Sequence, residues 1–382
     1  MIINTPPMGW NSWNTFGHNI NEELIKEIAD VMAADGYLDA GYEYLVVDDC
    51  WQADTRDRNG RLTPDKKKFP NGMKAVADYV HSKGLKFGIY SCAGQLTCEG
   101  FPGSYEHEFI DAETFAEWGV DFLKYDFCFK PKGADTACLY RRMGMALANC
   151  GRDILFSACS WGAEETRKWA KTTGAHMWRS TGDIVDSAAS IKDHAYMIDR
   201  DLKYMSTSSY ADFDMLVVGM HGDGNVGVGG ATDEMYRSHF TFWAQMSSPL
   251  MIGCDIRNIN EYTKQTLLNK DIIAINKESC WQPYEIGQIG SWNPKGNPVY
   301  CKLLSTGELA IGIYNFYEDE ANLSTPLDRI GLNMSTGKTL EMTEIWTGKK
   351  ELVHNGVHKV RIEPWGCRLY RCRIVDLQYG DM

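Results

Sequence analysis

Residues 44–49 read Tyr-Leu-Val-Val-Asp-Asp, four apolar residues followed at once by two carboxylates. A continuous apolar run of this kind is typical of a strand buried on both faces, as in a parallel sheet. Upstream, residues 22–35 place apolar side chains at helical spacing, and Gly36 ends that helix. The sequence therefore predicts a repeating unit of helix, glycine and buried strand, with polar residues where the strand ends.

The same unit recurs through residues 1–282. About eight such units close into a (β/α)₈ barrel, so we expect a TIM barrel over this part of the chain. The seventh strand is weakly marked, which leaves a doubly wound open sheet as an alternative. Besides 44–49, the predicted strands lie at residues 8–13, 86–90, 120–126, 154–159, 176–181, within 203–218 and at 248–254.

The pattern changes after residue 282. Segments such as 308–316 and 339–346 alternate or run short, and Thr-Gly at 347–348 and Asn-Gly at 355–356 are turn signals between segments. Asn-Gly is a strong cue for a β-hairpin. We expect an antiparallel β-sandwich over residues 283–382.

The composition excludes several classes of partner. The formal net charge of the 382 residues is −12, with no basic cluster beyond Lys66, Lys67 and Lys68. Nucleic-acid binding needs concentrated positive charge, so we expect no nucleic-acid partner. No stretch approaches the ~20 apolar residues of a membrane span, and the N-terminus lacks a leader pattern. We expect a cytoplasmic protein, or a secreted one if a leader has been removed, with no membrane partner and self-association left open.

The cysteines give no sign of a metal or redox site. The 12 cysteines are scattered, and no C-x-x-C pair occurs. Most are expected to be buried and unpaired, as small apolar residues. No metal ion and no cofactor are predicted.

Side chains at the carboxyl ends of barrel strands converge on one mouth, where the active sites of such barrels lie. The set found there combines carboxylates, two cations and aromatic residues, which suits a neutral polyol such as a sugar. Carboxylates accept hydrogen bonds from hydroxyls, cations donate to them, and aromatic faces pack on ring C–H groups. These strand-end residues are Trp13, Asp48, Asp49, Tyr90, Lys124, Asp126, Ser160, Arg179, Asp183 and Asp214.

Two of these carboxylates fit glycoside hydrolysis, which needs a pair flanking the scissile bond, about 5–5.5 Å apart in the retaining mechanism. Asp126 and Asp183 follow the fourth and sixth strands and form the predicted pair. A cation near Asp126, such as Lys124, would keep it ionised, and Arg179 also lies close to the pair in sequence. These patterns leave open which carboxylate attacks. Asp186 lies near Asp183, and either could instead cap the following helix.

Short motifs occur in a characteristic colinear order: Met-Gly-Trp-Asn-Ser-Trp at 8–13, Val-Asp-Asp-Cys-Trp at 47–51, Thr-Cys-Glu-Gly-Phe-Pro-Gly-Ser at 97–104, Leu-Lys-Tyr-Asp at 123–126, Trp-Arg at 178–179 with Asp183, Asp-Met-Leu-Val-Val-Gly at 214–219, and Asp-Ile-Ile-Ala-Ile-Asn at 271–276. They resemble glycoside hydrolase family 27, which contains α-galactosidases and α-N-acetylgalactosaminidases. The resemblance covers roughly residues 5–280, and a C-terminal sandwich is expected with it. It implies a retaining exo-α-glycosidase with Asp126 as nucleophile and Asp183 as general acid/base.

The resemblance also implies the sugar pocket. Asp48 and Asp49 would bind the hydroxyls that distinguish galacto from gluco sugars. Cys98 and Cys128 match positions that form a disulfide beside the pocket in family members, and the sequence leaves open whether they are bridged here. The implied pocket residues are Trp13, Asp48, Asp49, Tyr90, Cys98, Lys124 and Arg179.

Ser160 and Ala163 bear on the substituent at the 2-position of the sugar. α-Galactosidases of plants and animals carry a Glu and a bulkier residue there, whereas the small pair matches the N-acetylgalactosaminidase pattern. A Glu would collide with an acetamido group, while Ser and Ala leave room for it. We therefore expect an oligosaccharide or glycoconjugate ending in α-N-acetylgalactosamine, with α-galactose as a close alternative. Ser160 could equally be a strand-end hydroxyl with no ligand.

The chain departs from the family at several positions, including residues 210–214, which lack the expected Trp-Asn-Asp-Pro sequence before the seventh-strand motif. Phe127 replaces the glycine that usually follows the nucleophile, and Cys92 stands where many members have Asp. His176 takes the place of a cysteine that secreted relatives pair with the one at Cys159. The lost cysteine supports a reducing compartment. Phe127 bears on the shape of the pocket and on the leaving group.

Other functions stay open. Lys124 at a strand end could form a Schiff base with a carbonyl substrate, as in an aldolase or lyase. Lys124 and Asp126 could also be a structural ion pair. The barrel could bind sugar without hydrolysing it, or act on a related pyranoside such as a β-L-arabinopyranoside.

Overall fold

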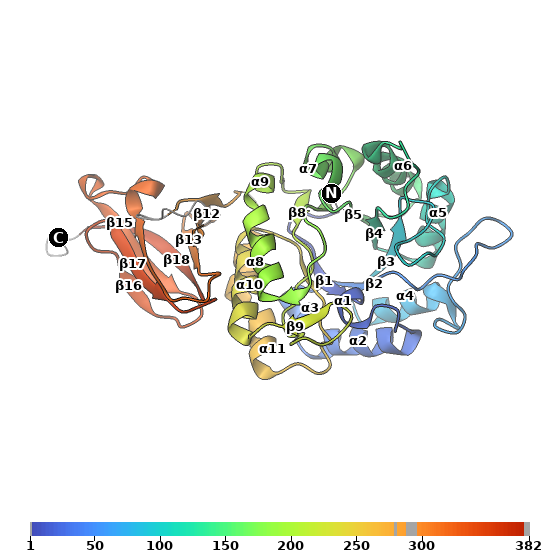
Figure 1. Ribbon diagram of the computed structural model, residues 1–382, viewed down its shortest axis with the longest axis horizontal. Helices are drawn as coiled ribbons and strands as arrows, with labels where there is room; N and C mark the ends of the chain where they lie inside the picture. The colour runs from blue at the N-terminus through green and yellow to red at the C-terminus, as the bar shows by residue number, and fades with distance from the viewer. Residues whose placement is uncertain (1, 279–280, 288–295, 378–382) are drawn as a thin grey trace.

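The computed structural model describes residues 2–278, 281–287 and 296–377. Its larger part is a sheet of eight strands in the order β10-β1-β2-β3-β4-β5-β6-β8, in which all neighbours pair in parallel. Helices surround this sheet, and the C-terminal strands lie to one side (Figure 1). The strands are β1 (Met8–Asn11), β2 (Tyr44–Val47), β3 (Lys86–Cys92), β4 (Phe122–Asp126), β5 (Leu155–Ala158), β6 (Met177–Arg179), β8 (Tyr210–Asp212) and β10 (Leu250–Ile252).

The sheet closes on itself just after β8. Leu216 bridges in parallel to Ile252, and its N–H donates to the carbonyl of Met251 at 2.8 Å. The predicted barrel is therefore confirmed, and the open-sheet alternative is wrong. The seventh strand is hard to see in sequence because two buried carboxylates interrupt its apolar run: Asp212 ends β8, and Asp214 follows with a φ of 76°.

The strand at residues 44–47 shows why these runs are apolar throughout. Leu45 and Val47 belong to the large core between the sheet and its helices. Tyr44 and Val46 point the other way, into a cluster that includes Phe122 and residues of other barrel strands. Both faces of the strand are therefore buried, one against helices and one inside the barrel.

The helices pack around the sheet, and the helix predicted at 22–35 is α2. The α-helices are α1 (Trp13–Phe16), α2 (Glu22–Ala34), α3 (Tyr37–Ala40), α4 (Gly72–Ser82), α5 (Glu108–Trp118), α6 (Thr136–Asn149), α7 (Thr166–Trp169), α8 (Ala188–Met197), α9 (Asp199–Leu202), α10 (Asp233–Gln245), α11 (Glu261–Leu267) and α12 (Lys270–Lys277). Shorter elements are the 3₁₀ turns η1 (Ala163–Glu165), η2 (Ala170–Thr173), η3 (Leu327–Ile330) and η4 (Met334–Thr336), and the small pair β7 (Asp186–Ser187) and β9 (Gly227–Gly230). Among the described residues, none of the helices has the length and apolar character that crossing a membrane requires.

The C-terminal part consists of two antiparallel sheets with an apolar layer of their own, so the predicted sandwich is confirmed. One sheet holds β11 (Tyr284–Glu285), β12 (Val299–Leu303), β13 (Leu309–Tyr314), β18 (Cys367–Asp376), β15 (Lys338–Glu344) and β16 (Lys350–Leu352), and the other holds β14 (Ala321–Pro326) and β17 (Val357–Ile362).

The two turn signals of this part have different outcomes. Thr-Gly at 347–348 joins the paired strands β15 and β16, as predicted. The hairpin expected at Asn355 and Gly356 is wrong, because β16 pairs with β15 whereas β17 pairs with β14. Both residues have positive φ, 56° and 66°, so the local turn forms but carries the chain from one sheet to the other.

The C-terminal part docks on α10, on the residues that follow it and on α12 through buried polar contacts. Gln245 donates from Nε2 to the carbonyls of Tyr300 and Ala310, at 3.0 and 3.1 Å. Lys302 donates from Nζ to Ser247 Oγ and to the carbonyl of Ile275, each at 2.6 Å. The domain boundary between residues 282 and 283 stays a prediction.

Gly144 offers a test of the barrel packing. It lies within α6, and a Cβ added there would meet the carbonyl oxygen of Thr173 at 1.8 Å. We expect Gly144→Ala to lower the free energy of unfolding by about 1–3 kcal/mol, because the helix must move away from the turn. Urea unfolding measures this, with Met145→Ala as control because that side chain is 54% exposed on the same helix. Equal stability of the two variants would contradict the close contact.

Candidate active site

One cavity at the carboxyl ends of the barrel strands gathers most of the predicted site residues. Trp13, Asp48, Asp49, Tyr90, Cys98, Lys124, Asp126, Arg179 and Asp183 line it. Tyr90, Lys124, Asp126 and Arg179 come from the last residues of β3, β4 and β6, and the other side chains come from the loops or turns that follow strands. Asp214, another of the predicted strand-end residues, also lines the cavity. The lining residues that the sequence did not predict are Asn14, Trp161, Ile184, Met215 and Val226.

Asp48 and Asp49 form the acidic floor and are almost completely buried, 2% and 1% exposed. Asp48 Oδ2 accepts from Asn11 Nδ2 at 2.6 Å and from Lys124 Nζ at 2.7 Å. Asp49 accepts from the backbone N–H groups of Cys50 at 2.7 Å and Glu99 at 3.1 Å. Burial, reinforced by the charge of Asp48, raises the pKa of Asp49 to about 6 despite these hydrogen bonds. Both carboxylates are thus fixed acceptors.

Lys124 is the cation of this floor. Burial alone would lower its pKa, but the carboxylates around it, Asp48 above all, outweigh burial and raise the pKa above its usual value. A lysine held protonated is a hydrogen-bond donor rather than a nucleophile. The ion pair with Asp48 therefore favours a hydrogen-bonding role for Lys124 over the Schiff-base alternative.

Asp126 ends β4 and is 6% exposed. Its Oδ1 accepts from the backbone N–H of Phe127 at 2.8 Å, and its Oδ2 accepts from the Tyr90 hydroxyl at 3.1 Å. Burial raises the pKa of Asp126 to about 6, and the charge of Lys124 limits that rise. At neutral pH the group is therefore ionised and held in a fixed orientation.

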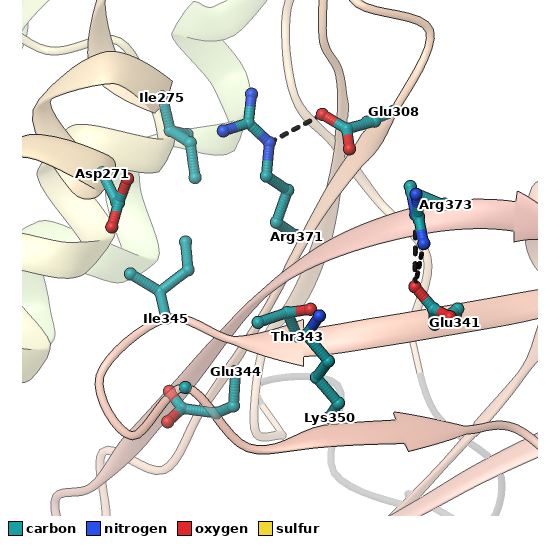
Figure 2. Close-up of a pocket in the computed structure, with 11 residues that line it drawn as sticks. Asp271, Ile275, Glu308, Glu341, Thr343, Glu344, Ile345, Lys350, Arg371 and Arg373 are labelled. Atoms are coloured by element: carbon teal, nitrogen blue, oxygen red, sulfur yellow. Dashed lines mark hydrogen bonds and ion pairs between the residues drawn. The ribbon is translucent and has the colours of Figure 1, made fainter.

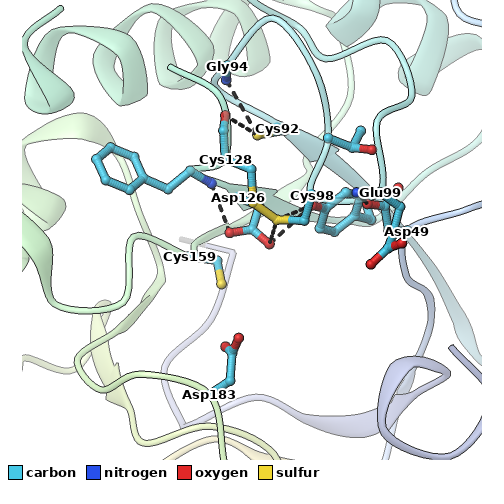
Figure 3. The surroundings of a disulfide bond; sticks show 12 residues. Asp49, Cys92, Gly94, Cys98, Glu99, Asp126, Cys128, Cys159 and Asp183 are labelled. Atoms are coloured by element: carbon cyan, nitrogen blue, oxygen red, sulfur yellow. Dashed lines mark hydrogen bonds between the residues drawn. A yellow bond between two sulfur atoms is a disulfide. The ribbon is translucent and has the colours of Figure 1, made fainter. Parts of the chain in front are cut away.

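Asp183 lies on the loop after β6, and its side chain is 70% exposed. Figure 3 shows Asp126 and Asp183 directed toward the same open space. Arg179 donates from Nη2 to Asp183 Oδ1 at 2.8 Å. Burial raises the pKa of Asp183, but Arg179 outweighs burial, so the pKa lies below its ordinary value. The neighbouring Asp186 has a different place: it accepts from Tyr236 and Gly222 at 2.7 Å each and does not line the cavity.

Asp214 is a further carboxylate that shares Arg179. Its Oδ2 lies 3.0 Å from Arg179 Nη2 and accepts from the N–H of Ile184 at 2.7 Å. It therefore ties the loop after β8 to the loop that carries Asp183. The sequence pattern predicted Asp214 as a strand-end residue. For Trp161 and Met215 the only signal in the sequence was their position next to Ser160 and Asp214.

Ser160 and Ala163 do not line the cavity. Ser160 is fully buried, and its Oγ lies 2.5 Å from Thr166 Oγ1. Its hydroxyl therefore has a protein partner, which agrees with the alternative that Ser160 is a strand-end hydroxyl with no ligand. Ala163 begins the turn η1. Trp161, between the two, is the residue of this loop that reaches the cavity.

Cys98 and Cys128 are joined by a disulfide, which links the loops after β3 and β4 (Figure 3). Cys98 Sγ lies 3.5 Å from Asp126 Oδ2. The bond therefore holds the loop that contributes Cys98 against the residue at the end of β4. Cys92 and Cys159 are free thiols buried nearby.

A separate hollow lies between α12 and the C-terminal sheet, with Asp271 and Ile275 on its barrel side (Figure 2). Its arginines pair with carboxylates of the same surface: Arg371 Nε donates to Glu308 at 2.7 Å, and Arg373 pairs with Glu341. It shares no lining residue with the cavity at the barrel mouth.

Known proteins resemble both parts of the chain. The family described as alpha galactosidase A matches residues 5–278, and the family described as alpha galactosidase C-terminal beta sandwich domain matches residues 295–372. The chain belongs to the α-galactosidase family, glycoside hydrolase family 27. The α-galactosidase of Cyamopsis tetragonoloba is 41% identical over 369 residues, covering 96% of this chain and 85% of that protein. This family member is therefore a glycoside hydrolase.

Solved structures of this family have the same fold. α-Galactosidase I from Mortierella vinacea superposes with a TM-score of 0.87 at 32% identity, covering 98% of each chain. The α-galactosidase from Saccharomyces cerevisiae, solved with raffinose, gives 0.84 at 26% identity and covers 97% of this chain and 98% of that one. The barrel and the sandwich thus occur together in other α-galactosidases.

The buried charge of Asp126 has a measurable effect on stability. The pKa of Asp126 in the folded protein, about 6, lies above its ordinary value of 3.8. The protonated side chain therefore contributes to the free energy of unfolding fully below pH 3.8, and this contribution is lost as the pH rises through 6. We expect Asp126→Asn to gain stability relative to the unsubstituted protein between pH 4 and pH 7.5, by up to about 2 kcal/mol. Urea unfolding at both pH values tests this. A relative loss of stability toward pH 7.5 would contradict the burial argument.

Proposed function

We propose that this α-galactosidase family member hydrolyses terminal α-galactosides with retention of configuration, using Asp126 as nucleophile and Asp183 as general acid/base. The observation that carries the proposal is the pairing of a fixed, buried carboxylate with an exposed one that is directed into the same cavity. A retaining glycosidase needs these two environments: one group attacks from a defined position, and the other exchanges a proton with the leaving group and then with water.

In the first step, Asp126 attacks the anomeric carbon while the bond from that carbon to the leaving oxygen breaks. Asp183 gives its proton to that oxygen, so the leaving group departs as a neutral alcohol. Asp183 must therefore hold a proton at that moment, although Arg179 favours its ionised form in the free protein. Arg179 also contacts Asp214 at 3.0 Å, so its charge stays balanced when Asp183 is protonated.

In the second step, the ionised Asp183 takes a proton from water, and the resulting hydroxide oxygen attacks the anomeric carbon. The bond between the sugar and Asp126 breaks, which restores the carboxylate and completes the double displacement. Lys124 supports both steps because its charge favours the ionised form of Asp126.

The floor of the cavity supports recognition of the sugar. Asp48 and Asp49 offer fixed carboxylate acceptors to neighbouring hydroxyls, and Lys124 offers an ammonium donor. Trp13 adds an aromatic side chain to the wall. A relative binds raffinose, an oligosaccharide, and we propose an oligosaccharide or glycoconjugate as substrate here as well.

α-N-Acetylgalactosamine is the second candidate for the terminal sugar. It is favoured by the sequence pattern alone: Ser160 and Ala163 stand where α-galactosidases of plants and animals carry a glutamate and a bulkier residue, and small side chains would leave room for an acetamido group. The Ser160 hydroxyl is engaged by Thr166, so the argument depends on room rather than on a hydrogen bond to the acetamido group. The curated relatives are named α-galactosidases, and α-galactose is therefore placed first.

Localisation in the cytoplasm stays a prediction. Its support is His176, which stands where secreted relatives carry a cysteine. Buried thiols such as Cys92 and Cys159 remain free alongside the disulfide of Cys98 and Cys128.

Substitution of the two carboxylates tests the mechanism. We expect Asp126→Asn to lower the turnover of p-nitrophenyl α-galactoside by about 10⁴-fold or more, because the amide cannot replace the carboxylate as nucleophile. A 2-fluoro or epoxide galactosyl reagent should label Asp126, as mass spectrometry of the peptides would show. Asp183→Asn should also lose activity, whereas the matched variant Asp186→Asn should retain most of it. Near-normal turnover by Asp126→Asn would rule out this nucleophile.

The terminal sugar is tested by the double substitution Ser160→Glu with Ala163→Leu. We expect it to shift the ratio of kcat/KM for p-nitrophenyl α-galactoside over the α-N-acetylgalactosaminide by at least about 10-fold toward galactose, because the added bulk excludes an acetamido group. Thr166→Ala is the control, since it removes the partner of Ser160 without adding volume. An unchanged ratio would show that these positions do not face the 2-substituent.

A further inference from the structure

His194 is a buried histidine close to the loop that carries Asp183, and the proposed mechanism does not use it. It lies on α8, which begins at Ala188 shortly after that loop, and it is 5% exposed. Both ring nitrogens face backbone carbonyl oxygens: Nδ1 lies 2.8 Å from the oxygen of Ser190, and Nε2 lies 3.1 Å from that of Gly182. The ring therefore joins the helix to the residue directly before Asp183.

The two contacts determine what the ring of His194 can do. A carbonyl oxygen accepts hydrogen bonds and cannot donate them, so a bond to either oxygen needs an N–H on the ring. A neutral imidazole has one N–H, whereas the imidazolium has two and can donate to both carbonyls. The imidazolium and one neutral tautomer carry a hydrogen on Nε2, and in these forms His194 donates to Gly182.

The peptide bond between Gly182 and Asp183 lies near the surface, so its orientation depends on the side chains that bond to it. Gly182 has no side chain of its own, and both residues are exposed. The carbonyl of Gly182 also accepts from Arg179 Nη2 at 2.6 Å. Two buried donors, Arg179 on β6 and His194 on α8, thus hold this oxygen. Because the peptide unit is planar, fixing the oxygen also fixes the backbone that leads into Asp183.

The backbone on the other side of Asp183 is fixed as well. The N–H of Ile184 donates to Asp214 Oδ2 at 2.7 Å. The N–H of Val185 donates to Ser190 Oγ, in the first turn of α8, at 3.1 Å. The chain before and after Asp183 is therefore bonded to neighbouring elements, while the side chain of Asp183 reaches into the cavity.

The hydrogen bond from His194 differs from the contacts of Arg179 in its response to the reaction. Arg179 Nη2 pairs with Asp183 Oδ1 at 2.8 Å, and this pair loses its negative partner whenever Asp183 takes up a proton. His194 bonds to a backbone carbonyl, whose charge stays the same throughout the reaction. The bond to the backbone therefore remains when the ion pair weakens, which is when Asp183 must be aligned to deliver its proton.

We propose that His194 is a positioning residue for the general acid/base, because its hydrogen bond to Gly182 keeps Asp183 directed at the leaving oxygen and then at the attacking water. The proposal rests on the role of Asp183 proposed above. His194 does not line the cavity, so it acts through the backbone and not on the sugar. Proton transfer by a positioned group contributes about 10²–10⁴-fold to the rate, and a misplaced Asp183 loses part of that factor.

Substrates that differ in their need for a proton test this role. Methyl α-galactoside has a poor leaving group that must be protonated, whereas 2,4-dinitrophenyl α-galactoside releases a phenolate without a proton. We expect His194→Phe to lower kcat/KM about 10-fold or more for the methyl glycoside and by less than about 3-fold for the dinitrophenyl glycoside. His194→Gln, whose amide nitrogen takes the place of Nε2, should recover most of this loss. His194→Asn, whose amide takes the place of Nδ1, should not.

Sodium azide tests the second step, because azide attacks the anomeric carbon without help from a base. It should raise kcat of His194→Phe on the dinitrophenyl glycoside by about 5-fold or more, with galactosyl azide as the product, and leave kcat of the unsubstituted protein unchanged. His358→Phe is the matched control, since His358 is also 5% exposed but lies on β17 of the sandwich. It should behave as the unsubstituted protein in both assays.

Asp183→Asn separates the positioning role from the proposed function. It should show the same selective loss and the same response to azide, both larger than in His194→Phe. Their absence in Asp183→Asn would count against the proposed function. If Asp183→Asn shows them, equal losses of His194→Phe and His194→Asn on both substrates, or no loss, would overturn the positioning role. A His194→Gln variant no better than His194→Asn would overturn the hydrogen bond to Gly182 as its cause.

Discussion

Lys124 on β4 pairs with Asp48, which follows β2, and lies two residues before Asp126 on its own strand; the rest of the site depends on this interaction. It donates to Asp48 at 2.7 Å and favours the ionised form of Asp126. Its place follows from strand register: Tyr90 pairs with Lys124 and Cys92 with Asp126, so alternate residues of β4 point into the barrel together. Removing one partner of a buried charge pair is strongly destabilising, which makes the cation necessary for the carboxylates.

The two proposed catalytic carboxylates differ because their surroundings differ. Asp126 is enclosed and ends a strand, so burial raises its pKa, whereas Asp183 lies on an exposed loop beside Arg179, which lowers its pKa. In the free protein these directions are the reverse of those that an acid/base and a nucleophile need. Arg179 pairs with both Asp183 and Asp214. When Asp183 takes up a proton, Asp214 still pairs with the guanidinium, so the positive charge of Arg179 stays balanced.

The C-terminal part is connected to this site through α10. Gln245 on this helix bonds to two strands of the sandwich, while Trp243 donates from Nε1 to the carbonyl of Asp214 at 3.1 Å. His239, one turn away, accepts from the N–H of Val217 at 3.2 Å. The helix thus bonds to the backbone of the irregular segment at the seventh strand, where buried carboxylates interrupt the apolar run. Docking of the sandwich stabilises the helix that holds Asp214 in place.

The sequence by itself determined the barrel, the sandwich and most residues of the cavity, because buried strands need continuous apolar runs and parallel strands bring their ends to one mouth. Only the tertiary structure decided contacts between distant loops. It placed the Ser160 hydroxyl on Thr166 rather than in the cavity and brought Trp161 to the wall. It also decided that the turn at Asn355 connects strands of two different sheets, because a local turn preference does not specify which strands pair. Periodicity records burial along one strand, whereas these contacts depend on how strands and loops far apart in the chain pack in space.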